Sequence, residues 1–340
     1  CPSIADPQKA YLVPTPYLCS GILQTAYKAV TDFSVDKCTD IKYDRETHIM
    51  SDRGTVSLDW YPSQCRDKHD RTPIAIIMTG VGGSSREYCI RAIAKALADG
   101  PLCYRAVVMN HRGSGRTPLT SPLFCSIHDT GDIREMALHM RMRYPNAPLV
   151  AVGLSLGANV LAKYLGEEGS SCPLAAAVTV GCPFDMTATG RLVDGDSLLS
   201  SYLVRPKLVN TLRRYLLSNE QGIQSGDTKY DMDGIRRARF MHEIGDLVPV
   251  MTLGMKNCWE YYDYASSSHV VDRICTPYLA INSLDDPVSA AEGVPVDKFR
   301  KNPNIALALV KYGGHLGFFT GMQPKIWYLK PVVEFFAAMV

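Results

Sequence analysis

The residues that first suggest chemistry are a G-x-S-x-G run at residues 153–157 and the serine at its centre, Ser155. An apolar run at 149–154 leads into it, and alanines and leucines at helical spacing follow from 155 to 165. A serine on a tight turn between a strand and a helix has an exposed hydroxyl, and the helix N-terminus behind it favours developing negative charge. The pattern therefore predicts that Ser155 is a nucleophile.

His315 is the candidate general base for this serine. It stands in the run GGHLGF at residues 313–318, directly after an apolar run at 305–310 that has the length of a strand. A glycine-flanked loop at a strand end can bring an imidazole over the sheet edge where Ser155 is expected. Most of the other histidines lie upstream of this region or inside helical patterns: His48, His69, His128, His139 and His242.

An acid that orients the imidazole is expected between the serine and the histidine in the chain. Two adjacent aspartates, Asp285 and Asp286, follow the apolar run at 277–282. We favour Asp286, because it begins the turn that Pro287 rigidifies, whereas its neighbour would more plausibly bond to turn amides. Asp285 stays open as an alternative, and Asp185 is a more distant third candidate.

Two backbone N–H groups must stabilise the oxyanion that forms when a serine attacks an ester. One is expected from Leu156, and Val81 in the glycine-rich run TGVGGS at 79–84 is the candidate for the other. A phosphate-binding loop is excluded at this run because G-x-x-x-x-G-K-S/T does not occur. His111 and Arg112 are interpreted as structural residues that stabilise their own loop.

Apolar runs that alternate with helical patterns must position these residues. Strands are predicted at 55–60, 73–78, 106–109, 149–154, 174–180, 277–282 and 305–310, and helices near 90–97, 129–142, 155–165, 296–301 and from 325. Strands that alternate with helices indicate a mostly parallel sheet with helices on both faces.

The alternation is interrupted over residues 185–273, which read as mostly helical. We therefore expect one core made of residues 1–184 and 274–340, with residues 185–273 inserted as a helical cap. Val209, Leu212 and Leu216 are expected to roof an apolar channel. Between residues 205 and 239 there are eight basic and four acidic residues, so the cap is a candidate for contact with an anionic lipid surface.

Composition excludes some classes of protein. The net charge of +2 over 340 residues gives no electrostatic case for nucleic-acid binding. The eleven cysteines show neither a CxxC pair nor zinc spacing, so neither a metal nor a cofactor is expected. We expect them to be buried free thiols in a reducing compartment, with an oxidised secreted protein as the alternative.

Taken together, these runs resemble the α/β-hydrolases. Within that superfamily the chain is similar to the subfamily of YheT-type hydrolases, yeast medium-chain ethyl ester synthases, and animal abhydrolase-domain lipases and phospholipases. The similarity covers nearly the whole chain. Its specific runs are PTPY (14–17), SGILQT (20–25), TGVGGS (79–84), NHRG (110–113), GLSLGAN (153–159), YYDYAS (261–266), NSLDD (282–286) and GGHLGF (313–318).

The resemblance implies an α/β-hydrolase fold with an inserted helical cap, and its triad falls on Ser155, Asp286 and His315. Two departures from the family pattern bear on the pocket. Ile22 stands where the family commonly has His, and Thr79 stands where it often has His or Pro. An H-x-x-x-x-D element, associated with acyl transfer in some relatives, is absent from the sequence.

The resemblance also implies a serine esterase or lipase acting on medium- or long-chain acyl esters. The alternatives are an alcohol O-acyltransferase that uses the same triad, and a non-catalytic protein that binds lipophilic ligands. We expect a small lipophilic ester substrate and no nucleic acid, and the residues do not indicate an oligomeric state. The chain begins at Cys1 rather than Met. We therefore expect an intracellular protein with a lipid-surface or membrane association through a segment before Cys1.

Overall fold

The computed structural model describes residues 12–31, 41–63 and 69–340. Cys1, and with it the expected preceding segment, lies outside these residues. A central sheet is built from strands β1 (Asp44–Ile49), β2 (Thr55–Tyr61), β3 (Ile74–Met78), β4 (Arg105–Asn110), β5 (Leu149–Leu154), β6 (Ala176–Val180), β7 (Tyr278–Ser283) and β8 (Ile305–Val310). The strand order is β1-β2-β4-β3-β5-β6-β7-β8.

The sheet is mostly parallel, as the alternating pattern predicts. Strands β1, β2 and β4 pair antiparallel, and β4, β3, β5, β6, β7 and β8 pair parallel. Every residue of β3, β4, β5, β6 and β7 is buried. These strands are buried on both faces, which explains why they read as continuous apolar runs.

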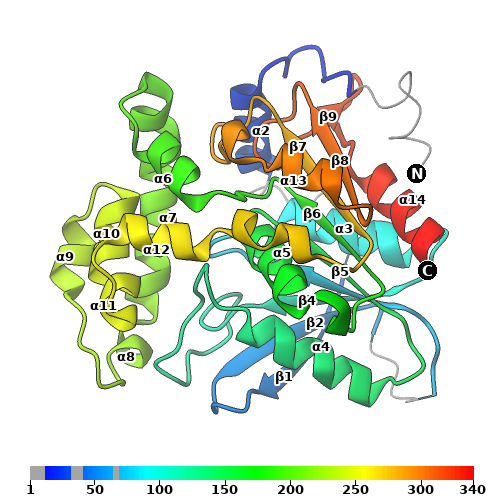
Figure 1. Cartoon of the computed structure of the whole chain (residues 1–340), viewed down its shortest axis with the longest axis horizontal. Helices are drawn as coiled ribbons and strands as arrows, with labels where there is room; N and C mark the ends of the chain where they lie inside the picture. The colour runs from blue at the N-terminus through cyan, green and yellow to red at the C-terminus, as the bar shows by residue number, and fades with distance from the viewer. Residues whose placement is uncertain (1–11, 32–40, 64–68) are drawn as a thin grey trace.

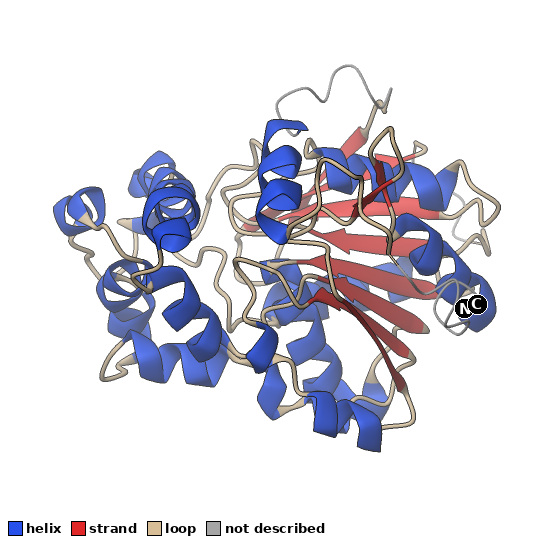
Figure 2. Ribbon diagram, turned by 90° about the horizontal axis from the view of Figure 1, so that it is seen from above, coloured by secondary structure: helices blue, strands red, loops and turns tan. Residues whose placement is uncertain are grey.

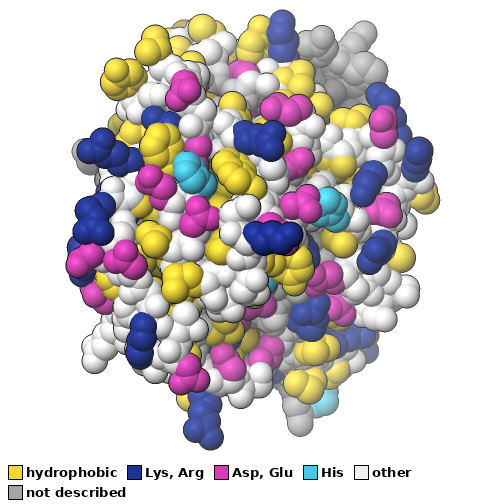
Figure 3. All heavy atoms as spheres, turned by 60° about the vertical axis from the view of Figure 1, so that its left-hand side comes forward, with side chains coloured by type: hydrophobic (Ala, Val, Ile, Leu, Met, Phe, Trp, Pro, Cys, Tyr) yellow, Lys and Arg dark blue, Asp and Glu magenta, His cyan; other side chains and the backbone are white. Residues whose placement is uncertain are grey.

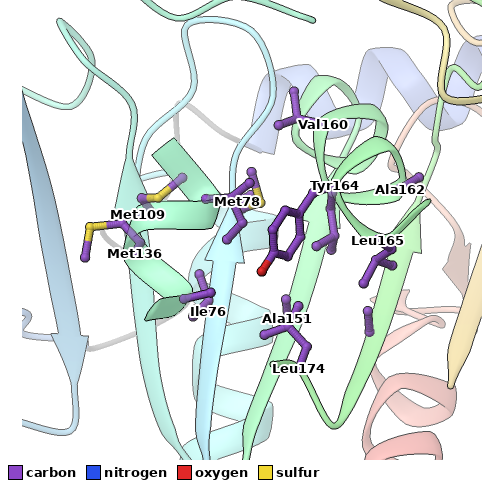
Figure 4. Packing of buried hydrophobic residues seen from close by; sticks show 14 of the residues in the cluster. Ile76, Met78, Met109, Met136, Ala151, Val160, Ala162, Tyr164, Leu165 and Leu174 are labelled. Carbon is purple, nitrogen blue, oxygen red and sulfur yellow. The ribbon is translucent and has the colours of Figure 1, made fainter. Parts of the chain in front are cut away.

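Helices cover both faces of the sheet (Figure 1). Helices α3 (Tyr88–Ala98) and α14 (Leu329–Met339) pack on one face, and α4 (Gly131–Arg143), α5 (Leu156–Glu168) and α13 (Val296–Lys301) pack on the other. Figure 4 shows the second interface, where Ile76 and Ala151 of the sheet lie close to Tyr164 and Leu165 of α5. Helix α5 is therefore fixed to the sheet by a continuous apolar core.

Some elements were not predicted or begin elsewhere. Strand β1 is polar except for Ile49, and helix α2 (Gly21–Thr31) buries only Gly21 and Gln24, so neither contributes large apolar side chains to the core. The last helix begins at residue 329 rather than 325, so the predicted start is wrong. Residues Lys325–Ile326 form strand β10, which pairs with β9 (Phe319–Thr320).

Residues 185–273 form a group of helices beside one end of the sheet (Figure 2). They are α6 (Met186–Asp194), a π-helical turn (Ser200–Val204), α7 (Arg205–Ser218), α8 (Glu220–Ile223), α9 (Met232–Arg237), α10 (Met241–Leu247), α11 (Pro249–Leu253) and α12 (Cys258–Ala265). The segment ends in two 3-10 turns, Ser267–His269 and Val271–Arg273, which pack against α5 of the core. The two ends of this segment meet, because the Met186 N–H donates to Ser266 Oγ at 2.9 Å and the Ser268 N–H to the Phe184 carbonyl at 2.9 Å. We refer to residues 185–273 as the cap.

The cap has apolar clusters of its own, one of which centres on Val209, Leu216, Ile223 and Ile235. Among the described residues, no helix is long and apolar enough to cross a membrane.

All eight cysteines in the described ranges are free thiols. The expectation of burial is wrong for three of them, Cys19, Cys103 and Cys275, which are exposed. Cys1, Cys38 and Cys65 lie outside the described residues.

Candidate active site

Ser155 occupies the turn between β5 and α5 in a strained backbone conformation. Its φ of 52° and ψ of −117° are unusual for a residue with a side chain, and such strain is concentrated at functional sites. The Ser155 N–H donates to the Val180 carbonyl at 3.0 Å, which ties the turn to β6. As the N-cap of α5 the serine makes no side-chain cap bond, so its hydroxyl is available to other groups.

The two glycines of the G-x-S-x-G run are required by close backbone contacts. A Cβ at Gly153 would lie 2.6 Å from the Gly157 carbonyl oxygen, and a Cβ at Gly157 would lie 2.5 Å from the Thr79 carbonyl oxygen. The Gly157 N–H donates to that same Thr79 oxygen at 3.1 Å. The run therefore lets the nucleophile turn pack directly on the end of β3.

Ser155, His315 and Asp286 form a hydrogen-bonded chain. The distance from Ser155 Oγ to His315 Nε2 is 2.8 Å, and that from His315 Nδ1 to Asp286 Oδ2 is 2.9 Å. A carboxylate only accepts hydrogen bonds, so Nδ1 carries the proton and Nε2 accepts from the serine hydroxyl. The Asp286 side chain is fully shielded from solvent, whereas 12% of the His315 side chain is exposed.

The other oxygen of Asp286 is held by its own turn. Asp286 Oδ1 accepts from the N–H groups of Val288 at 2.7 Å and Ser289 at 2.9 Å. The carboxylate is thus fixed by two backbone donors while Oδ2 faces the imidazole. This arrangement has the geometry by which a carboxylate orients a histidine for proton transfer.

The alternative acids are placed elsewhere. Asp285 Oδ1 accepts from the N–H groups of Gly313 at 2.9 Å and Gly314 at 3.0 Å, in the loop that carries the histidine. Asp185 is the N-cap of α6 and accepts from the Ala188 N–H at 2.9 Å. Neither bonds to the imidazole, although Asp285 shapes the loop that presents it.

Val81 and Leu156, the residues expected to supply the oxyanion donors, both line a cavity beside Ser155. The hydrogen bonds found within the described ranges engage neither of their backbone N–H groups. A Cβ at Gly80 would lie 3.3 Å from Ser155 Cβ, which shows how closely this loop approaches the nucleophile. Both N–H groups remain candidates for oxyanion binding.

A buried aspartate that the sequence did not single out, Asp59, holds this loop from behind. It accepts from Arg45 through both oxygens at 2.6 Å, and from Ser85 Oγ and Asn110 Nδ2. Asn110 Oδ1 in turn accepts from the Ser85 N–H at 3.0 Å. Burial alone would raise the pKa of Asp59, but these hydrogen bonds outweigh it and keep the pKa below its ordinary value.

The cavity beside Ser155 has a volume of about 120 Å³ and lies between the cap and the sheet. Its walls are largely apolar and include Leu212 and Leu216 of α7 and Ile244 of α10. The expectation that Val209 lines this space is wrong, because Val209 is not among the residues of the cavity wall and packs in the cap's own apolar cluster. Val209 and Leu216 lie seven residues apart and therefore on the same face of α7, so the cavity meets only the C-terminal part of that face.

The interpretation of Arg112 as structural agrees with its contacts. It bonds to both carboxylate oxygens of Asp132, and its Nη1 bonds to Asp52 at 2.6 Å. Its carbonyl accepts from the hydroxyl of Tyr215 in α7 at 2.7 Å. This contact joins the cap to the loop below it. His111 is buried, and burial lowers the pKa of its imidazole.

Sequence reasoning gave no individual role to Gln24 and Thr25 of helix α2. Thr25 Oγ1 accepts from the His315 N–H at 2.8 Å, and the wholly buried Gln24 bonds to Phe319 in the same loop. The only available signal was the run SGILQT, whose type and spacing do not themselves indicate chemistry. No group of His, Cys, Asp and Glu in the described part of the chain has the arrangement of a metal site.

Comparison with known families decides where the chain belongs. Residues 73–322 match a family model described as the alpha/beta hydrolase fold, which is most of the chain. The chain belongs to the alpha/beta hydrolase fold family. The Ser155 turn and His315 both lie within the matched residues of this family.

Several relatives in this family are 30% identical to the chain. The medium-chain fatty acid ethyl ester synthase/esterase 2 of Saccharomyces cerevisiae aligns with 95% of this chain and 84% of its own length. Phospholipase ABHD3 of Homo sapiens aligns with 84% of this chain and 69% of its own length. The embryogenesis-associated protein EMB8 of Picea glauca aligns with 83% of this chain, which spans only 62% of that relative. These relatives confirm the expected subfamily and the enzyme class, a carboxylic ester hydrolase.

Solved structures confirm the fold. The esterase Pf2001 of Pyrococcus furiosus superposes with a TM-score of 0.55 at 15% identity, over 88% of this chain and 93% of that one. The protein lip1 of Acinetobacter baumannii gives a TM-score of 0.53 at 15% identity, over 93% of this chain and 97% of that one.

Proposed function

We propose that the protein is a serine hydrolase that cleaves medium-chain acyl esters through an acyl-enzyme. Ser155 attacks the ester carbonyl while His315 takes its proton, and Asp286 orients the imidazole and stabilises its charged form. The N–H groups of Val81 and Leu156 stabilise the tetrahedral oxyanion. His315 then protonates the leaving alcohol, and water activated by the same imidazole releases the acid.

The observation that carries this proposal is the continuous chain from Ser155 Oγ through His315 to Asp286, with distances of 2.8 and 2.9 Å. A structural serine in a glycine-rich turn needs no such partner. A binding protein on the same fold would gain nothing from the strained backbone at Ser155, which costs on the order of 1–3 kcal/mol. The geometry therefore favours an enzyme over the non-catalytic alternative.

The size of the apolar cavity supports a medium-length acyl chain. An apolar protein cavity of about 150 Å³ holds a benzene ring. The cavity of about 120 Å³ beside Ser155 therefore fits roughly five carbon atoms beyond the ester carbonyl. Because its walls are apolar, polar acyl groups would lose their hydration without gaining hydrogen bonds.

A panel of p-nitrophenyl esters tests this proposal. We expect kcat/KM to rise from acetyl to about hexanoyl and then to fall, with no turnover by Ser155→Ala. A flat profile, or a preference for acetyl, would contradict the role of the cavity. Turnover by the Ser155→Ala variant would contradict the choice of nucleophile.

Acyl transfer to an alcohol is the second candidate, because the name of the yeast relative includes both synthase and esterase. The two reactions share the acyl-enzyme and differ only in the molecule that attacks it. Incubation of the enzyme with an octanoyl ester and excess ethanol separates them through the ratio of octanoic acid to ethyl octanoate. We expect mostly acid, and a predominance of ethyl octanoate would identify a transferase.

We also propose that the cap contacts an anionic lipid surface. The segment between α6 and α7 projects from the cap in Figure 1 and exposes Leu198, Tyr202 and Leu203, which are 77%, 76% and 58% accessible. Figure 3, which turns the cap side of the molecule forward, shows hydrophobic, basic and acidic side chains interspersed on this face. The basic excess lies in residues 205–239, with eight basic and four acidic residues, whereas the whole cap has eleven basic and twelve acidic residues. Apolar residues next to such a basic segment are typical of proteins that bind lipid surfaces.

Vesicle co-sedimentation tests this contact. We expect binding to phosphatidylcholine vesicles that contain phosphatidylserine, and weaker binding after Leu198→Ser, Tyr202→Ser and Leu203→Ser are combined. The matched control is Leu138→Ser with Met142→Ser, two exposed apolar residues of α4. Equal binding by all three proteins would refute the cap contact.

A further inference from the structure

Helix α2 lies directly against the loop that carries His315. A Cβ at Gly314 would lie 2.2 Å from the Gly21 carbonyl oxygen, and a Cβ at Gly317 would lie 2.9 Å from Gln24 Cβ. On the other side of the helix N-terminus, a Cβ at Gly21 would lie within 2 Å of the Asp285 carbonyl oxygen. Three glycines therefore allow α2 to approach both loops that carry the acid and the base.

Thr25 makes the most direct connection to the histidine. Its Oγ1 accepts from the His315 N–H at 2.8 Å and donates to the Gly21 carbonyl at 2.6 Å, so both functions of the hydroxyl are used. A hydroxyl that accepts one bond and donates another can be replaced by serine but not by valine.

Gln24 fixes the far end of the same loop. Its Oε1 accepts from the Phe319 N–H at 2.6 Å. Its Nε2 donates to the carbonyls of Phe319 at 3.2 Å and Leu18 at 2.9 Å. The side chain is wholly buried, so these bonds are shielded from water. Thr25 and Gln24 thus hold the loop at its histidine and at the strand that follows.

The loop needs such support because its own backbone is strained. Leu316 and Phe318 have φ values of 65° and 46°, in the left-handed region that residues with side chains rarely adopt. Conformations of this kind persist only where the surrounding structure enforces them. Helix α2 restrains the loop backbone from one side through the hydrogen bonds of Gln24 and Thr25.

The opposite side of the loop is held by β7 and the residues that follow it. Asp285 accepts from the N–H groups of Gly313 and Gly314, and Ser283 Oγ donates to the Gly314 carbonyl at 3.0 Å. The backbone up to the His315 nitrogen is therefore bonded from two directions. Among these side-chain bonds to the backbone of residues 313–315, α2 supplies the one from Thr25 to the His315 N–H.

We propose that Gln24 and Thr25 are positioning residues that set the angle at which His315 faces Ser155. Neither touches the reacting atoms; they act through the loop backbone. Helix α2 lies outside residues 73–322, which match the family model, so this chain completes its active site with a segment that precedes the matched region. The inference rests on the proposed serine-hydrolase function and adds a determinant of its rate.

Thr25→Val, Thr25→Ser and Thr31→Val test the proposal. Thr31 is a matched control because its hydroxyl also donates to a carbonyl of α2, that of Lys28 at 2.9 Å, and because it is the last residue of the helix, six positions beyond Thr25. We expect Thr25→Val to lower kcat for an octanoyl ester by about 10- to 100-fold with little change in KM. Thr25→Ser and Thr31→Val should stay within about threefold of the wild type.

A second readout does not depend on substrate. The His315 Nδ1 proton, which is hydrogen-bonded to a carboxylate, should give a low-field proton NMR signal, assigned by its loss in Asp286→Asn. We expect Thr25→Val to shift or broaden this signal while Thr31→Val leaves it unchanged. If Thr25→Val matches Thr31→Val in both kcat and this signal, the positioning role is refuted. A wild type that hydrolyses no ester, with a signal that still depends on Thr25, would instead refute the proposed function alone.

Discussion

Asp286→Asn and Asp285→Asn change adjacent residues in the same way, but we expect a large loss of kcat only in Asp286→Asn. In Asp286→Asn the amide oxygen can still accept from Val288 and Ser289, as Oδ1 does in the native protein. The amide nitrogen then faces His315 Nδ1, which is 2.9 Å from Oδ2 in the native protein. Two donors cannot bond to each other, so the imidazole is driven to the tautomer that carries its proton on Nε2.

That tautomer cannot accept the proton of Ser155. Loss of an oriented base in a Ser-His-Asp arrangement lowers kcat by about 10⁴-fold, or about 5.5 kcal/mol of transition-state stabilisation. In Asp285→Asn the amide oxygen still accepts from Gly313 and Gly314. The second oxygen of Asp285 is buried and has no partner within the described ranges. We therefore expect a change in kcat below about threefold.

The assay is hydrolysis of an octanoyl p-nitrophenyl ester, combined with thermal unfolding to confirm that both variants fold. Equal losses in the two variants would refute the assignment of the acid, since the backbone bonds of Asp285 would then matter as much as orientation of the imidazole. More than a tenth of the native kcat in Asp286→Asn would contradict the proposed role of this residue.

Three further predictions follow from the surroundings of the site. Gly157→Ala should abolish folding or activity because its Cβ would lie 2.5 Å from the Thr79 carbonyl oxygen, whereas Gly131→Ala, whose nearest neighbour is a side chain, should be tolerated in the same expression and activity assays. Leu212→Trp should fill the cavity and lower the octanoyl-to-butanoyl ratio of kcat/KM by about tenfold, and an unchanged ratio would place the acyl chain elsewhere. The depressed pKa of Asp59 means that it stabilises the fold above its unfolded pKa and that this contribution is lost as the pH falls through the folded pKa. Urea unfolding between pH 3 and 7 should therefore show a weaker pH dependence in Asp59→Asn, and an identical dependence would exclude this linkage.

The sequence was informative where local pattern and function coincide. Ser155 could be found because a strand, a glycine-rich turn and a helix adjoin it in the chain, and His315 because it follows the last strand. The sequence could favour Asp286 over Asp285 but could not decide between them. Adjacent carboxylates on one turn differ in the direction of their side chains, which the sequence pattern does not show. Their separate bonds depend on the three-dimensional path of residues 313–315.

Other parts of the site carried no local signal. Thr25 accepts a hydrogen bond from the His315 N–H although the two residues are 290 positions apart, so only the folded chain brings them together. Asp59 stands in an ordinary strand pattern, and its partners come from three other segments. Val209, expected at the cavity, has the same spacing pattern as Leu212 and Leu216, but it lies closer to the start of α7, and the sequence does not show how far along the helix the cavity extends.

The most direct test of the account is reaction with an alkyl fluorophosphonate followed by peptide mass spectrometry. We predict a single adduct on Ser155 and labelling that is slowed by orders of magnitude in His315→Ala. No labelling of the folded protein, or an adduct on another residue that persists in Ser155→Ala, would contradict the central claim that Ser155 is a nucleophile activated by His315.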